Sequence, residues 1–142
     1  MTEMATAPTP ELRAAGTHLL VDLIGASRLD DPALIEQVLR ECVRATKASL
    51  LYIYVHHFGG AGGVTGVAVL AESHISIHSW PEHDFAAVDV FTCGTTDPEM
   101  AIPVLEANFR PKRVTVQWLK RGRAAFAAAN QFAPITAETT SQ

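Results

Sequence analysis

Four β-rich runs follow one another closely in the middle of the chain, with no space for a helix between them. The runs cover residues 50–55, 64–70, 74–80 and 85–92. Consecutive strands with short connections usually lie side by side in one sheet, and their direction alternates. The sequence therefore predicts a mostly antiparallel sheet as the centre of the fold.

Two helices and two outer strands complete the predicted pattern. Asp31-Pro32 and Asp97-Pro98 each place a capping Asp directly before a Pro, which suits the first turn of a helix. Apolar residues then recur at helical spacing to about Lys47 and to Phe109. The outer strands are expected at residues 18–24 and 114–119. The predicted order is β-α-β-β-β-β-α-β.

This order predicts an α+β fold, a two-layer α/β sandwich with both helices on one face of the sheet. The other face then needs a cover, and a second subunit is the simplest one. At 142 residues the chain is one domain by size. We expect the folded domain at residues 15–127, between flexible tails at residues 1–14 and 128–142 that are rich in Ala and Thr.

Composition argues against several classes of function. The net charge of −4 includes no strong basic field, so nucleic acid is not an expected partner. No apolar stretch reaches the ~18 residues of a membrane span, and the start lacks the pattern of a signal peptide. Cys42 and Cys93 do not make a disulfide framework, and Cys42 is expected to fill the core from the first helix. We expect a cytoplasmic protein with reduced thiols.

Chemically capable side chains gather in one segment. Residues 71–82 read AESHISIHSWPE, and Cys93 follows in FTCG. In an extended strand, His74, Ser76 and His78 share one face, and the two Ile residues between them point to the core. Asp89 interrupts the apolar strand FAAVDVF and needs a polar partner or water.

The residues alone leave three interpretations open. A zinc site would need more ligands than His74 and His78, which lie ~13 Å apart on a straight strand. A serine hydrolase at Ser73 would lack the Gly-x-Ser-x-Gly elbow and the helix that follows it. The third interpretation is a binding domain whose histidines are only polar surface residues, and spacing alone favours it.

The glycine-rich loop at residues 56–63, HHFGGAGG, matches neither a P-loop nor a dinucleotide fingerprint, because a strand follows it.

The motif AESHISIHSWPE followed by AAVDVFTCG resembles the signature of the short prokaryotic S-adenosylmethionine decarboxylase proenzymes. GTHLLVDLIG, the HHF before the glycine loop, VTGV and KRVTVQWLKRGR resemble the same family in the same order. The resemblance covers about residues 16–123. It implies an enzyme that makes its own pyruvoyl cofactor and uses no metal.

In that family the proenzyme cleaves itself at a Glu-Ser bond, which here is Glu72-Ser73. The resemblance implies a β chain of residues 1–72 and an α chain of residues 73–142, with a pyruvoyl group derived from Ser73. Thr65, in VTGV, matches the hydroxyl residue that assists cleavage, where the family more often has Ser. His78 matches the base that removes the α-proton of Ser73.

The resemblance also implies roles in the mature enzyme. The pyruvoyl group would form a Schiff base with the substrate amine and act as an electron sink, as PLP does elsewhere. Cys93 matches the proton donor, Glu82 a carboxylate that binds ribose hydroxyls, and Phe58 a ring that stacks on adenine. The implied reaction is decarboxylation of S-adenosylmethionine, which supplies aminopropyl groups for spermidine. The implied assembly is a homo-oligomer of processed units, a dimer or a dimer of dimers.

Two departures from the family pattern concern substrate identity. The chain has GGAGG where the family often has Pro and a bulkier residue, and Asp84-Phe85 where the family commonly has Gly-Tyr. Both lie where substrate is expected to bind. Decarboxylation of another amine, such as arginine or ornithine, and a non-catalytic binding homologue are therefore the alternative functions.

Overall fold

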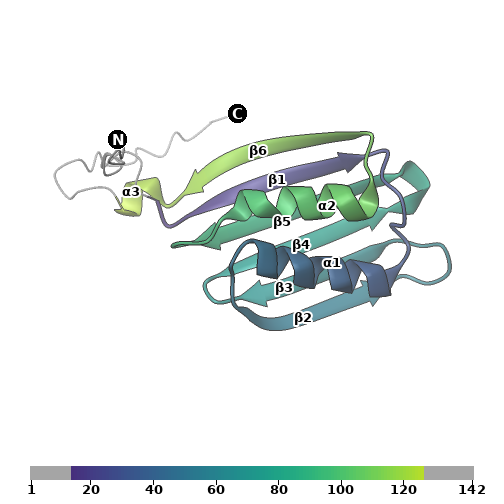
Figure 1. Cartoon of the computed structure of the whole chain (residues 1–142), viewed down its shortest axis with the longest axis horizontal. Coiled ribbons are helices and arrows are strands. Elements are labelled where there is room, and N and C mark those ends of the chain that lie inside the picture. The colour runs from purple at the N-terminus through teal and green to yellow at the C-terminus, as the bar shows by residue number, and fades with distance from the viewer. Residues whose placement is uncertain (1–13, 127–142) are drawn as a thin grey trace, which may run out of the picture.

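The computed structural model describes residues 14–126, which form one antiparallel sheet with helices on one face (Figure 1). The sheet has six strands in the order β2-β3-β4-β5-β1-β6. The strands are β1 (Gly16–Ile24), β2 (Leu50–His57), β3 (Val64–Leu70), β4 (Ser73–Trp80), β5 (Phe85–Cys93) and β6 (Arg113–Arg121). The predicted fold class and element order are confirmed. The predicted tails lie outside the described residues, apart from Ala14, and the domain limits stay a prediction.

Helix α1 (Pro32–Ala45) forms as the sequence predicts. The Asp31 side chain accepts a hydrogen bond from the backbone N–H of Leu34 at 3.0 Å, which satisfies a free donor of the first turn. One stripe of the helix is buried against the sheet: Leu34, Ile35, Val38, Leu39, Cys42 and Val43. Cys42 has no exposed surface, so its predicted role as a core filler is confirmed.

The second helix begins later than predicted. The segment after Asp97 is a 3₁₀ turn, η3 (Pro98–Met100), and the α-helix α2 runs over Ala101–Phe109. The Asp97 side chain makes no capping hydrogen bond. An α-helix starting at Pro98 would need an N–H at residue 103, but that residue is Pro and has none. The short helix α3 (Arg123–Phe126) follows β6, where the sequence predicted no element.

The core lies between the helices and the central strands. Ile75 and Ile77 of β4 are at most 1% exposed, so the apolar face predicted for this strand is confirmed. Each such side chain contributes about 1.5–3 kcal/mol by leaving water. The helix-facing residues of β1 and β5 are buried with them: Leu19, Val21, Leu23, Ala86, Val88 and Val90.

Within residues 14–126, no helix lies on the opposite face of the sheet (Figure 1). Residues that face each other across paired strands share a face, and the register assigns His74, Ser76 and His78 of β4 to this open face. Large side chains of the same face are exposed, among them Tyr52, Tyr54, Val69, Trp80 and Leu119. The face therefore carries polar and large apolar side chains together. None of the helices within residues 14–126 has the length and apolarity to cross a membrane.

Candidate active site

The bond between Glu72 and Ser73 lies at a tight, exposed turn. Leu70 of β3 pairs with Ser73 of β4, so only Ala71 and Glu72 connect the two strands. Glu72 has a φ of 60°, a left-handed conformation that costs a residue with a side chain about 1–2 kcal/mol. The Ser73 hydroxyl donates a hydrogen bond to the Ala71 carbonyl oxygen at 3.2 Å. The predicted cleavage bond is thus held in a strained backbone beside its own hydroxyl.

The predicted proton donor lies against this turn. The Cys93 thiol, at the end of β5, donates to the Oε2 atom of Glu72 over 3.6 Å. Burial, the hydrogen bond to Glu72 and the negative charge of that carboxylate together raise the pKa of the Cys93 thiol. The sulfur is therefore a protonated thiol at neutral pH, the state that a proton donor requires.

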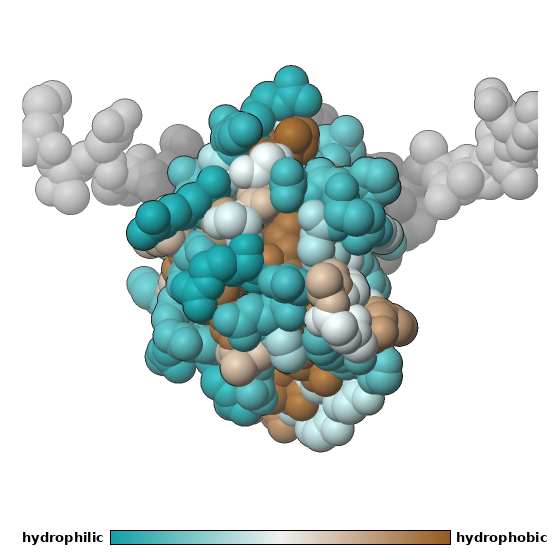
Figure 2. Space-filling view, turned by 90° about the vertical axis from the view of Figure 1, so that its right-hand side faces the viewer, coloured by the Kyte–Doolittle hydropathy of each residue, from teal (hydrophilic) through white to brown (hydrophobic). Residues whose placement is uncertain are grey.

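A second group forms at the other end of β4. Thr65 of β3 and His78 of β4 are directly opposed, and the Thr65 Oγ1 atom lies 3.1 Å from the His78 Nδ1 atom. Both line a pocket of about 310 Å³ together with Phe58 and Glu82. Figure 2 views the molecule from this end of the sheet and shows a band of apolar surface between hydrophilic side chains.

The glycine-rich loop closes against this pocket. A Cβ atom at Gly63 would collide with the Ser79 carbonyl oxygen, so only Gly allows the loop to approach β4 so closely. The loop is held by a hydrogen bond from the Phe58 N–H to the Gly63 carbonyl at 3.0 Å. Gly59 and Gly60 have positive φ values that Gly adopts without strain. Of the GGAGG segment, Gly63 therefore forms part of the pocket wall.

Three pocket residues were missed by sequence reasoning: Gly63, Ser79 and Trp80. The Trp80 ring stacks on Phe85 with centroids 5.4 Å apart, which places one of the departures from the family pattern beside the pocket. The Ser79 hydroxyl accepts from the Val64 N–H and donates to the Leu29 carbonyl. Trp80 could have been found from its place in the WPE motif. Ser79 could not, because its role depends on distant backbone partners.

The two groups of predicted site residues do not meet within one chain. Ser73 begins β4, and His78 stands five residues further along the same strand. At about 3.3 Å per residue, the two residues lie about 17 Å apart. Glu72, Ser73 and Cys93 gather at one end of β4, and Thr65 and His78 gather at the other. One copy of the chain does not bring the predicted base to the predicted cleavage bond.

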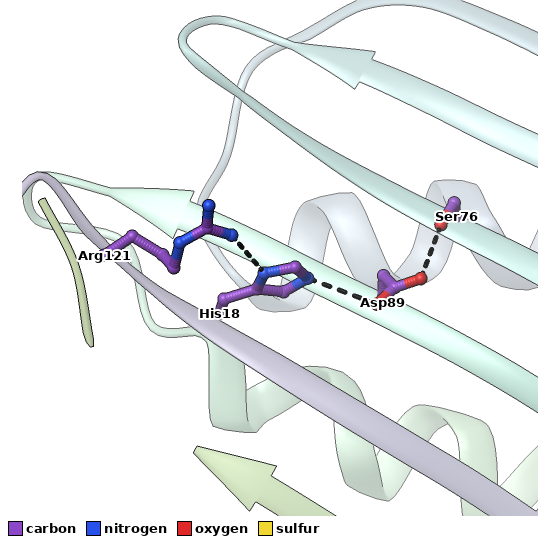
Figure 3. A network of polar contacts seen from close by, with 4 residues as sticks. All are labelled: His18, Ser76, Asp89 and Arg121. Atoms are coloured by element: carbon purple, nitrogen blue, oxygen red, sulfur yellow. Dashed lines mark hydrogen bonds and ion pairs between the residues drawn. The ribbon is translucent and has the colours of Figure 1, made fainter. Parts of the chain in front are cut away.

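A polar network occupies the open face between these two groups (Figure 3). The His18 Nε2 atom lies 3.2 Å from the Asp89 carboxylate, and the Ser76 hydroxyl donates to the other Asp89 oxygen at 3.3 Å. Arg121 donates to the His18 Nδ1 atom at 3.2 Å, so the ring proton of neutral His18 lies on Nε2 and points at Asp89. The predicted need of Asp89 for polar partners is confirmed.

The histidines of the open face pack against aromatic rings. His74 lies edge-on to His18 at 6.0 Å and beside Phe91 at 5.8 Å between ring centroids. Within residues 14–126, no three His, Cys, Asp or Glu side chains converge as metal ligands. The geometry thus offers a thiol, hydroxyls and a histidine in two groups on one sheet.

Comparison with known proteins finds relatives of one family. Residues 17–122 match the protein family described as S-adenosylmethionine decarboxylase. A relative from Thermomicrobium roseum, named S-adenosylmethionine decarboxylase proenzyme, is 46% identical over 112 residues, which are 78% of this chain and 97% of the relative. A relative of the same name from Pyrobaculum aerophilum is 48% identical over 104 residues, which are 71% of this chain and 83% of the relative.

A solved structure is similar as well. The crystal structure of the adenosylmethionine decarboxylase from Aquifex aeolicus has a TM-score of 0.69 and 33% sequence identity, and the match covers 92% of this chain and 99% of that one. The fold and these relatives define a small α+β enzyme, a decarboxylase of the kind named as a proenzyme. The chain belongs to the S-adenosylmethionine decarboxylase family, which confirms the predicted resemblance.

Proposed function

We propose that the chain is a self-processing, pyruvoyl-dependent decarboxylase of S-adenosylmethionine, which makes the aminopropyl donor for spermidine in the cytoplasm. Family membership supports the reaction class. The observation that carries the proposal is the turn itself, where left-handed Glu72 precedes Ser73 and contacts the Cys93 thiol. The Glu72–Ser73 bond, which self-cleavage would break, and the Cys93 thiol, which would donate the proton after decarboxylation, thus lie side by side.

Self-cleavage suits the local geometry. The Ser73 hydroxyl is covalently close to the Glu72 carbonyl, so proximity replaces a second reactant. An attack on that carbonyl forms an ester to the Ser73 oxygen and breaks the amide bond, so the acyl group of Glu72 moves from nitrogen to oxygen and the Ser73 amine is freed. By the family match, Thr65 assists this step and His78 removes the α-proton of Ser73. The contact between Thr65 and His78 supports their acting as a pair.

A second copy of the chain would complete the site. The open face has exposed Tyr52, Tyr54 and Trp80 side chains, and a packed partner would remove their apolar surface from water. We propose that such packing sets the Thr65–His78 pair of one copy beside the Glu72–Ser73 turn of the other. The assembly would then be a dimer or a dimer of dimers, as the family resemblance implies.

The pocket beside Thr65 and His78 suits the nucleoside part of the substrate. The Glu82 carboxylate, at the rim, would accept hydrogen bonds from ribose hydroxyls. The Phe58 ring is 66% exposed and is available to stack on adenine. The pyruvoyl group, once formed from Ser73, supplies a carbonyl that withdraws electrons as carbon dioxide leaves. The Cys93 thiol then provides the proton that replaces the lost carboxylate.

Mass spectrometry and substrate assays together test the proposal. The purified protein is expected to separate into two chains at the 72–73 bond and to release carbon dioxide from S-adenosylmethionine. Release from arginine or ornithine instead would overturn the substrate assignment. An intact chain of 15.3 kDa that releases no carbon dioxide from any of the three would indicate a non-catalytic binding homologue.

A further inference from the structure

The proposed self-cleavage gives no role to the side chain of Glu72. Self-cleavage uses the main-chain carbonyl of Glu72, and that chemistry is the same for any side chain. Yet the carboxylate of this exposed turn residue accepts the hydrogen bond of the Cys93 thiol, over 3.6 Å. The contact joins residues 21 positions apart in sequence, so the hairpin turn and the end of β5 create it together.

We infer that Glu72 is a positioning residue for Cys93: its side-chain carboxylate orients the thiol proton and keeps the sulfur protonated, before and after cleavage. This inference rests on the proposed function, in which the Cys93 thiol is the proton donor. The contact between Glu72 and Cys93 does not depend on that function. A carboxylate beside a thiol disfavours the thiolate, because two negative charges would then lie close together. The raised pKa of the Cys93 thiol, to which Glu72 contributes after burial, agrees with this.

The contact can outlast the break in the chain. After cleavage Glu72 is the last residue of the β chain, and its position depends on how firmly β3 is held. β3 lies between β2 and β4 in the sheet, and Leu70 is only 2% exposed. The Ala71 N–H also donates to the Ser49 carbonyl at 3.0 Å. Both residues belong to the β chain, so this bond can hold the end of that chain after cleavage. Cleavage also turns the main-chain carbonyl of Glu72 into a second carboxylate of the same residue.

This arrangement suits repeated proton donation. When carbon dioxide leaves, the substrate carbon that carried the carboxylate keeps the electron pair of the broken bond. The thiol proton of Cys93 moves to this carbon, and Cys93 becomes a thiolate. The thiolate beside Glu72 is unfavourable, so the sulfur takes a proton from water and the donor is restored. Glu72 thus favours the reactive acid form at both the start and the end of a turnover.

Two cationic side chains of β6 make their hydrogen bonds with other residues. Lys120 of β6 lines a small pocket together with Cys93, but its Nζ atom donates to the Thr17 hydroxyl at 2.7 Å. Arg121 of the same strand donates to His18. Among the described residues, the hydrogen bond of the Cys93 thiol is with Glu72.

The test is the rate at which iodoacetamide alkylates Cys93 across neutral and alkaline pH. Peptide mass spectrometry separates Cys93 from Cys42, which is fully buried and has a pKa raised to about 12 by burial. The measurement is made on the uncleaved Ser73→Ala chain, with and without Glu72→Gln. Glu106→Gln, an exposed change on α2, is the matched control. The midpoint of alkylation is expected at lower pH with Glu72→Gln, with severalfold faster alkylation at neutral pH.

An unchanged midpoint with Glu72→Gln, or an equal shift with Glu106→Gln, would overturn the inference. This result stands apart from the proposed function, because the Ser73→Ala chain contains no pyruvoyl group and needs no substrate. In the processed enzyme, Glu72→Gln should move the alkaline limb of kcat to lower pH without changing KM. If the wild-type chain neither cleaves nor decarboxylates, the proposed function fails while the thiol measurement still decides the contact.

Discussion

The Thr65 hydroxyl and the His78 ring lie 3.1 Å apart at opposed positions on β3 and β4, at the far end of β4 from Ser73. The residues proposed for self-processing thus fall into two groups at the two ends of β4. The proposed cleavage bond and the thiol are at one end, and the hydroxyl–imidazole pair is at the other. Several expected outcomes depend on that division.

Replacing Ser73 with Ala should leave one uncleaved chain. Without the hydroxyl there is no internal nucleophile for the Glu72 carbonyl. Mass spectrometry should then show the intact 15.3 kDa chain after prolonged incubation. Ser76→Ala is the control, because its hydroxyl lies on the same strand but donates to Asp89, and that variant should still cleave. Cleavage of the Ser73→Ala chain at the same bond would contradict the assignment.

Replacing His78 with Ala should slow the formation of the α chain by about 10²–10⁴-fold, the usual contribution of a general base. Thr65→Ala should also slow processing, while Thr65→Ser keeps the hydroxyl and should process well. The time course of cleavage, followed by gel electrophoresis, measures both. Equal rates for Thr65→Ala and Thr65→Ser would show that the hydroxyl has no part in processing.

Co-expression should restore cleavage if two copies share each site. The Ser73→Ala chain keeps His78, and the His78→Ala chain keeps Ser73, so a mixed oligomer would contain one complete site. The His78→Ala chain is therefore expected to be cleaved much faster in the mixture than by itself. A partner with both changes is the matched control and should restore nothing. No cleavage in either mixture would mean that the site is not shared.

Gly63→Ala should destabilise the protein and disturb the pocket. The added Cβ atom would collide with the Ser79 carbonyl oxygen, so the loop must move away from β4. Crowding of this kind costs about 1–3 kcal/mol. The free energy of unfolding in urea, measured in the uncleaved Ser73→Ala chain, should fall by that amount. Ala61→Ser, at an exposed position of the same loop, should have little effect.

Asp31→Ala should cost about 0.5–2 kcal/mol at neutral pH through loss of the α1 cap. The hydrogen bond from the Leu34 N–H, helped by Arg28, holds the pKa of Asp31 below its ordinary value of 3.8. The cap therefore contributes its full stabilisation above pH 3.8, the ordinary pKa of the group. This stabilisation is lost as the pH falls through the lower pKa that Asp31 has in the folded protein. The difference in unfolding free energy between the wild type and Asp31→Ala should shrink in acid.

Asp30→Ala is the control for the cap, because Asp30 is exposed and outside the capping position. Its effect should be small at both neutral and acidic pH. A difference between wild type and Asp31→Ala that stayed constant down to acidic pH would show that the carboxylate charge has no part in the cap.

Local patterns were sufficient for most of the fold. The strands, the α1 cap at Asp31 and the core face of β4 follow from spacing and from residue preferences that act over a few positions. The late start of α2 was missed because Pro103 restricts the helix from five residues beyond its expected start. The motif around Ser73 also identified the family without any structure, and the comparisons confirm it.

The sequence by itself determined most of the elements, the candidate site residues and the family. Only the tertiary structure decided which of these side chains meet. The Glu72–Cys93 contact needs the β3–β4 turn and the end of β5 to lie together, and the Thr65–His78 contact needs one particular strand register. Register and strand order arise because one whole face of the sheet is buried against two helices. The free energy of this burial comes from many residues that are distant in sequence. Short segments do not contain that information, so they did not show which strands bring Thr65 to His78 or Cys93 to Glu72.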